Sequence, residues 1–289
     1  MFLADLIKWA INNYGVIVAY VYGHMGYGKT SYALWTAYEV LGDWDKVLDH
    51  VFFDLDEAVD FMYKHARRGK RVPIMIFDDA GFFLNRLTWW ERNKVRFMEM
   101  FNLARSIAAC VIFTAPSDEI PRQLLTKTSF RISVRPLAPE EINTTQALDA
   151  AELAKEFNLE PYVAVAKGYR LNILPSFLKY VEKEYIDYYP LHYPVFNEYN
   201  KIRMKYVRRA LEEFRLERAR ELEESKKREE RENLLREAVD MYTKLGPQET
   251  LRFLKGKIPW STAWYWVYER IPRLLKQGGV GEGSSTSTR

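Results

Sequence analysis

The sequence predicts an α/β protein whose parallel sheet is followed by a long charged helix and a small all-α unit. Up to about residue 135, β-favouring segments alternate with helical patterns, and the first of these segments is apolar throughout. A charge-rich stretch without Pro or Gly then begins near residue 198. The 289 residues can hold one sizeable core and something smaller, so we expect more than one domain.

The expected elements follow from local patterns in chain order. Apolar residues at helical spacing predict a first helix that ends at Gly15, a residue free to adopt positive φ. Asp54, with Glu57 three residues later, resembles the capping box that opens a helix, and residues 91–108 and 146–157 show longer helical patterns. The expected strands of the main sheet are residues 16–21, 51–53, 72–77, 110–114 and 130–134.

The strand and helix pattern weakens beyond Pro136. Residues 162–166 and 169–173 nevertheless favour strands. Lys167 and Gly168 separate the two segments, which predicts a small hairpin.

Charged residues dominate the stretch from 198 to 237, where they make up more than half of the sequence. Opposite charges four residues apart, such as Arg209 with Glu213, stabilise a helix by about 0.3 kcal/mol for each pair. No apolar residue occurs from 223 to 233, so a coiled-coil seam cannot be continuous there. We therefore expect a solvated helical connector.

The composition limits the classes of protein and the cellular locations that fit this chain. A net charge of +4 is too small to mark a nucleic-acid binder by itself. Cys110 is the one cysteine, which excludes an intramolecular disulfide, and the four histidines lack metal-ligand spacing. Polar residues interrupt the apolar N-terminal stretch before it reaches the roughly 20 apolar residues of a membrane span. We therefore expect a cytoplasmic protein without a membrane anchor.

A phosphate-binding loop is predicted at residues 23–30, GHMGYGKT, which match GxxxxGK[ST] between an expected strand and an expected helix. Its glycines let backbone N–H groups turn toward phosphate oxygens, and the helix N-terminus adds partial positive charge. Lys29 is expected to reach the β and γ phosphates of ATP, and the Thr30 hydroxyl to ligate Mg²⁺. The expected nucleotide-binding residues are Gly23, Gly26, Gly28, Lys29, Thr30 and Ser31.

The second half of such a site is an apolar strand that ends in acids. Residues 73–79, PIMIFDD, provide this pattern after the phosphate loop. Asp78 is expected to hold the Mg²⁺ ion, and Asp79 to orient the water that attacks the γ-phosphate. The Asp79 side chain is one methylene shorter than the Glu that many enzymes carry at this place.

A further expected strand ends at Thr114. If it lies between the phosphate-loop strand and the Asp78 strand, Thr114 faces the γ-phosphate and can sense it. Three arginines nearby are candidates for a finger that reaches into a neighbouring subunit's site, and spacing does not distinguish between them. They are Arg105, Arg122 and Arg131.

Together these motifs resemble the additional-strand class of P-loop ATPases, which includes RecA-like and AAA+ proteins. The stretch from Ala104 to Val134 is similar to the end of the FtsK/HerA-type DNA pump core, and this resemblance implies that Thr114 is the sensor and Arg131 the strand arginine. Ala115 stands where those pumps usually carry Gln. GHMGYGKT and IMIFDDAG also resemble the short, DnaA-like ATPases of viruses and plasmids of thermophilic archaea. The resemblance covers about residues 14–135.

The C-terminal part carries the local basic charge. Residues 241–276 hold seven basic and two acidic side chains, a net charge of +5 that exceeds the +4 of the whole chain. Three expected helices there, with a break at Gly246 and Pro247 and a third helix opened by Ser261, resemble a helix-turn-helix unit that binds double-stranded DNA. Its expected DNA contacts are Arg252, Lys257, Ser261, Thr262, Tyr265, Arg270 and Arg273.

A small helical oligomerisation module is the alternative for this part. In either case Trp260, Trp264 and Trp266 are expected to lie in its core. The expected domains are residues 1–190 (ATPase), 191–237 (connector), 238–277 (helix-turn-helix) and 278–289 (flexible tail).

We predict from these residues a homo-oligomeric, DNA-binding ATPase that hydrolyses ATP with Mg²⁺. The resemblance implies a use in replication initiation or partition of a mobile genetic element. Two alternatives stay open: a DNA translocase or packaging motor of the FtsK/HerA type, and a nucleotide-switched assembly factor that does not bind DNA.

Overall fold

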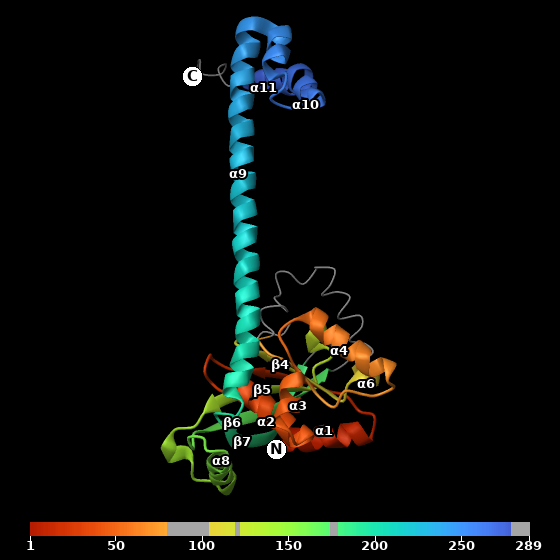
Figure 1. The fold of residues 1–289 in the computed structure, drawn as a ribbon, viewed down its shortest axis with the longest axis vertical. Coiled ribbons are helices and arrows are strands. Elements are labelled where there is room, and N and C mark those ends of the chain that lie inside the picture. The colour runs from red at the N-terminus through yellow and green to blue at the C-terminus, as the bar shows by residue number, and fades with distance from the viewer. Residues whose placement is uncertain (80–103, 119–121, 174–178, 279–289) are drawn as a thin grey trace, which may run out of the picture. The chain divides into compact units, whose positions relative to one another are not determined.

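The computed structural model describes residues 1–79, 104–118, 122–173 and 179–278. The chain divides into two compact units, Met1–Val207 and Arg208–Arg289. The first unit is α/β, and the described part of the second is helical (Figure 1). No helix among the described residues has the length and apolar character that crossing a membrane requires.

A seven-stranded sheet forms the centre of the first unit, in the order β2-β3-β4-β1-β5-β6-β7. The five strands from β2 to β5 in this order run parallel, whereas β6 and β7 are antiparallel additions beside β5. The strands are β1 (Ile17–Tyr22), β2 (Val51–Phe52), β3 (Met75–Phe77), β4 (Cys110–Ala115), β5 (Phe130–Pro136), β6 (Val163–Ile173) and β7 (Lys179–Pro190). The α/β class and the five expected strands of the main sheet are confirmed.

The hairpin expected within residues 162–173 is wrong. These residues form a single strand, β6, whose antiparallel partner is β7. The register shifts between Gly168 and Tyr169, and a Cβ atom on Gly168 would lie 2.2 Å from a ring carbon of Tyr185. Glycine at this position therefore marks a bulge and the close approach of an aromatic ring, not a turn.

Two hydrophobic cores cover the two faces of the parallel sheet. On β1, Ala19 and Val21 pack into one core together with side chains of α1 and α2, whereas Val18 and Tyr20 pack into the other with side chains of α4. Burial on both faces explains why this strand is apolar at every position. The helices of the first unit are α1 (Phe2–Asn12), α2 (Lys29–Leu41), α3 (Trp44–Asp49), α4 (Leu55–Arg67), α6 (Ala104–Ile107), α7 (Arg122–Leu125), the 3₁₀ turn η2 (Pro139–Glu141) and α8 (Thr145–Glu156).

The observed start of α4 agrees with the expectation from the sequence, whereas the observed end of α1 differs from it. The Asp54 carboxylate caps α4 by accepting hydrogen bonds from the backbone N–H groups of Asp56 and Glu57, as expected. At the end of α1, however, Tyr14 and not Gly15 adopts the left-handed conformation, with φ of 53°. The helix therefore closes one residue earlier than predicted. Most of the helix expected at residues 91–108 lies outside the described residues.

The second unit has its own hydrophobic core. Helix α9 (Phe196–Leu254) begins in the first unit and continues into this one, and Gly246 interrupts it with φ of 82° at the expected break. It is followed by α10 (Trp260–Tyr265), the π-helical turn η3 (Trp266–Arg270) and α11 (Ile271–Gly278). The core consists of Leu235, Ala238, Leu254, Ala263, Trp266, Val267 and Ile271.

The tryptophans of the second unit do not share one environment. Trp266 is buried in the core, but Trp260 and Trp264 expose 60% and 48% of their surface. The expectation that all three lie in the core is therefore wrong for two of them. The helix-turn-helix assignment stays a prediction, and the predicted tail beyond Gly278 lies outside the described residues.

Candidate functional site

The expected phosphate loop has the geometry of a strand, a loop and a helix. Strand β1 ends at Tyr22, and α2 begins at Lys29, with Gly28 as its N-cap. Gly26 and Gly28 have φ of 80° and 87°, in the left-handed region that glycine adopts readily. The loop thus takes a backbone shape that its glycines permit, at the N-terminus of a helix.

The Lys29 side chain folds back on this loop. Its ammonium Nζ donates hydrogen bonds to the carbonyl oxygens of Gly23 (3.0 Å) and His24 (2.9 Å). Burial lowers the pKa of Lys29, while the nearby carboxylates of Asp79 and Asp78 act to raise it. An ammonium has three N–H donors, so these two bonds leave one that can meet a phosphate oxygen.

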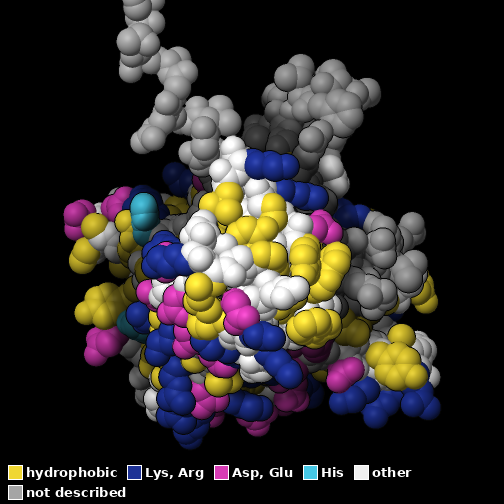
Figure 2. All heavy atoms as spheres, turned by 90° about the horizontal axis from the view of Figure 1, so that it is seen from above, with side chains coloured by type: hydrophobic (Ala, Val, Ile, Leu, Met, Phe, Trp, Pro, Cys, Tyr) yellow, Lys and Arg dark blue, Asp and Glu magenta, His cyan; other side chains and the backbone are white. Residues whose placement is uncertain are grey.

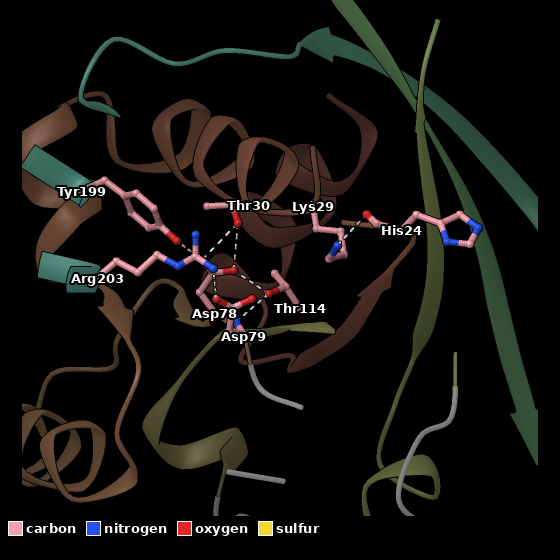
Figure 3. A network of polar contacts seen from close by, with 8 residues as sticks. All are labelled: His24, Lys29, Thr30, Asp78, Asp79, Thr114, Tyr199 and Arg203. Carbon is pink, nitrogen blue, oxygen red and sulfur yellow. Dashed lines mark hydrogen bonds and ion pairs between the residues drawn. The ribbon is translucent and has the colours of Figure 1, made fainter. Parts of the chain in front are cut away.

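Asp78 is the centre of the site (Figure 3). Its carboxylate is buried at the end of β3 and accepts hydrogen bonds from three hydroxyl groups. Thr30 of α2 contacts Oδ1 at 3.1 Å and Oδ2 at 3.0 Å, Thr114 of β4 donates to Oδ1, and Tyr199 of α9 donates to Oδ2. Burial raises the pKa of Asp78, and the hydrogen bonds from Thr114, Tyr199 and Thr30 oppose that shift.

The donor set at Asp78 fits a magnesium ion. The hydroxyl of Thr30 and the carboxylate of Asp78 are hard oxygen ligands within hydrogen-bond distance of each other. Among the described residues, no group of three or more His, Cys, Asp or Glu side chains could hold a metal. A cation at Asp78 would therefore take further ligands from phosphate and water, as Mg²⁺ does in nucleotide sites.

Asp79 points away from the core that buries Asp78. Its backbone has φ of 50°, and its N–H donates to the Thr114 hydroxyl at 3.0 Å. Its Oδ2 lies 2.6 Å from Nη2 of Arg203, and both side chains of this ion pair are nearly half exposed. Of the two acids, Asp79 is therefore the one open to solvent, which suits the expected role in orienting water.

Thr114 contacts both acids. Strand β4 lies between β1 and β3, so the sheet order on which the expected role of Thr114 depended is confirmed. The Thr114 side chain is fully buried, donates to Asp78 and accepts from the Asp79 N–H. Its response to a γ-phosphate stays a prediction.

Tyr199 and Arg203 were not expected in the site. Both lie in the charge-rich stretch that we expected to be a solvated connector, yet they belong to the first unit. One signal could have found Tyr199: it stands seven residues before Tyr206, on the same face of the helix. Both rings contact Phe53, with centroid distances of 5.8 Å and 5.2 Å.

The end of β7 supports the junction between the loop and α2. Tyr189 donates a hydrogen bond from its hydroxyl to the Gly28 carbonyl oxygen at 3.1 Å. The Ser31 hydroxyl donates to the Leu191 carbonyl oxygen at 2.5 Å and is buried. The Ser31 side chain is thus directed at the segment after β7 rather than at the loop. Its expected part in nucleotide binding stays a prediction, with the backbone N–H as the group that could meet a phosphate.

The three candidate arginines for a neighbouring site are not placed alike. Arg131 forms an ion pair with Asp118 at 2.6 Å and lies over the ring of Tyr22, 4.9 Å from its centroid, so it is held within its own chain. Arg105 lies in α6 and Arg122 begins α7, but their side chains lie outside the described part of the chain.

The seven expected DNA contacts all lie in the second unit. Arg252 pairs with Glu249 at 2.6 Å and Arg273 with Glu269 at 3.2 Å, one helical turn away in each case. Lys257 lies over the ring of Phe253, and Arg270 lies over the ring of Trp266. Ser261 and Tyr265 are exposed, and Thr262 is partly buried. Figure 2, seen from above relative to Figure 1, shows hydrophobic, basic and acidic side chains next to one another.

The chain has relatives among viral proteins. No protein-family model matches it. It is 39% identical over 107 residues to uncharacterized protein B-251 of Sulfolobus spindle-shape virus 1, which covers 34% of this chain and 43% of that protein. It is 28% identical over 102 residues to uncharacterized protein ORF286 of Acidianus two-tailed virus, which covers 34% of this chain and 36% of that protein. The chain thus spans less than half of the length of these curated relatives.

Among solved structures, the chain is similar to the genome packaging NTPase B204 from Sulfolobus turreted icosahedral virus 2. Its complexes with AMPPCP and with AMP each match with a TM-score of 0.33 and 16% sequence identity. The matches cover 60% of this chain and 100% and 99% of those chains. A TM-score of this size does not establish a common fold.

Proposed function

We propose that this chain is a Mg²⁺-dependent P-loop ATPase that binds double-stranded DNA through its C-terminal unit. One observation carries the catalytic half of the proposal. Lys29 and Thr30 at the start of α2 were expected from one motif and Asp78 at the end of β3 from another, and Thr30 and Asp78 are hydrogen-bonded in the structure. The ammonium, the hydroxyl and the carboxylate that MgATP requires therefore come from adjoining elements.

Each side chain then has a defined task. The loop N–H groups and Lys29 bind the phosphates, and Thr30 with Asp78 would hold the metal ion, which supplies charge neutralisation at the β and γ phosphates. Asp79 orients the attacking water from its exposed position. The Thr114 hydroxyl is hydrogen-bonded to both acids, so a change in its position on loss of the γ-phosphate would alter the contacts of Asp78 and Asp79 together.

The test of the catalytic half is nucleotide binding and turnover in a matched pair of lysine variants. Lys29→Ala is expected to lower ATP turnover at least 100-fold, because it removes the cation at the phosphates. Lys46→Ala is the control, since Lys46 is an exposed lysine of α3. Wild-type protein that neither binds ATP or GTP nor hydrolyses them, or a Lys29→Ala variant with wild-type turnover, would contradict the proposal.

The DNA-binding half is supported by the net positive charge of residues 241–276 and by the exposed positions of Ser261 and Tyr265 in α10. Its test is a gel-shift titration with random and selected duplexes, with and without ATP, at several salt concentrations. Arg273→Ala is expected to weaken binding and to reduce the slope of log K against log salt by about 1. A protein indifferent to DNA under all these conditions would remove this half of the proposal.

Replication initiation or partition of a mobile genetic element is the use we propose, supported by the resemblance of the motifs and by the viral relatives. Stimulation of turnover by one particular DNA sequence would favour this use. Stimulation by any long duplex would favour a DNA translocase or packaging motor with the same chemistry.

A nucleotide-switched assembly factor is the second candidate, and exposed aromatic rings favour it. Trp260, Trp264 and Tyr268 follow one another at intervals of four residues and are 60%, 48% and 44% exposed. Such a stripe suits a contact between subunits of a homo-oligomer. In the variant with Trp260→Ser and Trp264→Ser, loss of oligomers with unchanged duplex binding would favour the assembly role.

A further inference from the structure

The first turns of α9 contact both acids of the site. Tyr199 donates a hydrogen bond to Asp78, and Arg203, one helical turn later, forms the ion pair with Asp79. All four residues belong to the first unit. Figure 3 shows the two side chains approaching the acids from α9, on the side opposite Lys29.

Hydroxyl groups from three elements engage both oxygens of the Asp78 carboxylate. A carboxylate offers about four lone-pair sites, and three hydroxyl protons are directed at those of Asp78. Thr114 donates to Oδ1, Tyr199 donates to Oδ2, and the single proton of Thr30 is shared between the two oxygens. Direct coordination of Mg²⁺, or a hydrogen bond from a Mg²⁺-bound water, needs one of these sites. A metal–nucleotide complex that binds there therefore competes with these hydroxyl groups for the carboxylate.

Of the three hydroxyl groups, that of Tyr199 is the one that can leave. Thr30 is itself an expected metal ligand, so its hydroxyl stays at the site. Thr114 lies in β4, between two strands that are hydrogen-bonded to it, and is fully buried. Tyr199 is buried as well, at 3% exposure, but it lies near the start of α9 and outside the sheet, so its hydroxyl can withdraw from the carboxylate without breaking strand pairing.

Arg203 presents the same competition at Asp79. Its guanidinium donates a hydrogen bond to Oδ2 of Asp79 at 2.6 Å. One of the two oxygens of the carboxylate expected to orient water is therefore already occupied. A bound triphosphate places new negative charge near the guanidinium, because Arg203 is paired with an acid of the proposed nucleotide site. Nucleotide binding therefore weakens both contacts between α9 and the acids.

We propose that the start of α9 is a latch on the acidic pair, closed without metal–nucleotide and opened when metal–nucleotide binds. In the closed state Tyr199 and Arg203 occupy Asp78 and Asp79; in the open state both side chains leave them. The inference rests on the proposed nucleotide binding and adds its regulation.

The test compares nucleotide affinity with and without metal in two full-length tyrosine variants. Tyr199→Phe removes the hydroxyl that competes at Asp78, so it is expected to bind Mg²⁺ with a non-hydrolysable ATP analogue about fivefold more tightly than wild type. Its affinity for the analogue in EDTA is expected to be unchanged. Tyr206→Phe, on the same helix and in contact with Phe53, is the control and is expected to match wild type in both conditions.

Hydrogen–deuterium exchange of wild-type protein gives a second readout that needs no variant. With Mg²⁺ and the analogue, the backbone amides of residues 196–206 are expected to exchange faster than without them, while those of α8 stay unchanged. Slower exchange at 196–206, or Mg²⁺-dependent affinity in Tyr199→Phe that equals or falls below that of wild type, would overturn the latch alone. Wild-type protein that binds no nucleotide in either condition would overturn the latch together with the proposed function.

Discussion

Arg203 and Asp79 form an ion pair across 124 residues of sequence, with Nη2 and Oδ2 2.6 Å apart. The acid follows β3, and the arginine lies in a stretch whose composition predicts a solvated connector. The start of α9 therefore belongs to the candidate site. Its first turns contact the first unit, whereas its later turns carry exposed charged side chains.

The strength of this ion pair is predicted to be small. Both side chains are nearly half exposed, so the pair is expected to contribute about 0.2–1 kcal/mol to the free energy of unfolding. A double-mutant cycle with Asp79→Asn and Arg203→Ala, measured by denaturant unfolding, gives this coupling energy. The coupling is expected to fall at 1 M salt, where charges are screened within about 3 Å. A coupling above about 3 kcal/mol would show that the pair is buried and would contradict the structure.

Asp78→Asn is predicted to stabilise the nucleotide-free protein. Burial raises the pKa of Asp78 in the folded state. Above that pKa, the cost of burying the ionised carboxylate lowers the free energy of unfolding. Below about pH 4 the carboxyl group is protonated in both the folded and the unfolded state, so this cost is absent. The variant is expected to have a higher Tm at pH 7–8 by a few degrees, since about 1 kcal/mol shifts Tm by roughly 2–4 °C in a domain of 150–250 residues.

The pH dependence separates this effect from a general one. The gain from Asp78→Asn is expected to shrink as the pH falls toward about 4. Asp60→Asn, at an exposed position of α4, is the control. A gain that is the same at pH 4 and pH 8, or a loss of stability at pH 8, would refute the explanation.

Gly168→Ala is predicted to destabilise the first unit by about 1–3 kcal/mol, because the added Cβ overlaps a buried ring. Three ring carbons of Tyr185 would lie 2.2–2.7 Å from that Cβ atom, and the Tyr185 hydroxyl is bonded to Tyr32. Thermal unfolding measures the effect. In a Tyr185→Ala background the same change should cost less than about 0.5 kcal/mol; an equal cost there would show that the ring is not the cause.

Trp266→Ala and Trp264→Ala are predicted to differ strongly in the second unit. Trp266 is buried in its core, and its removal is expected to cost about 3–5 kcal/mol. Trp264 is 48% exposed, and its removal is expected to cost less than about 1 kcal/mol. Helicity lost on heating, followed by circular dichroism, compares them. Equal losses would mean that the two rings share one environment.

Much of the first unit could be predicted from local sequence. The strands at 16–21 and 110–114 were predictable because burial on both faces requires apolar residues throughout, and this shows without knowledge of the fold. GHMGYGKT and the acids after residue 77 were predictable because their chemistry depends on residues that are adjacent in the chain. The hairpin expected at 162–173 was a wrong prediction, because glycine is required at position 168 by the ring of Tyr185, a residue of another strand, and not by a turn.

By itself, the sequence determined that this chain has a parallel α/β core with a phosphate-loop motif, an acidic strand end and a separate basic C-terminal segment. Only the tertiary structure decided that β6 and β7 extend the sheet, that the Ser31 side chain faces away from the loop, that two tryptophans are exposed, and that Tyr199 and Arg203 reach the acids. The physical reason is that backbone pattern and motif chemistry act between neighbours in the chain, whereas burial and hydrogen-bond partners depend on segments that meet only after folding.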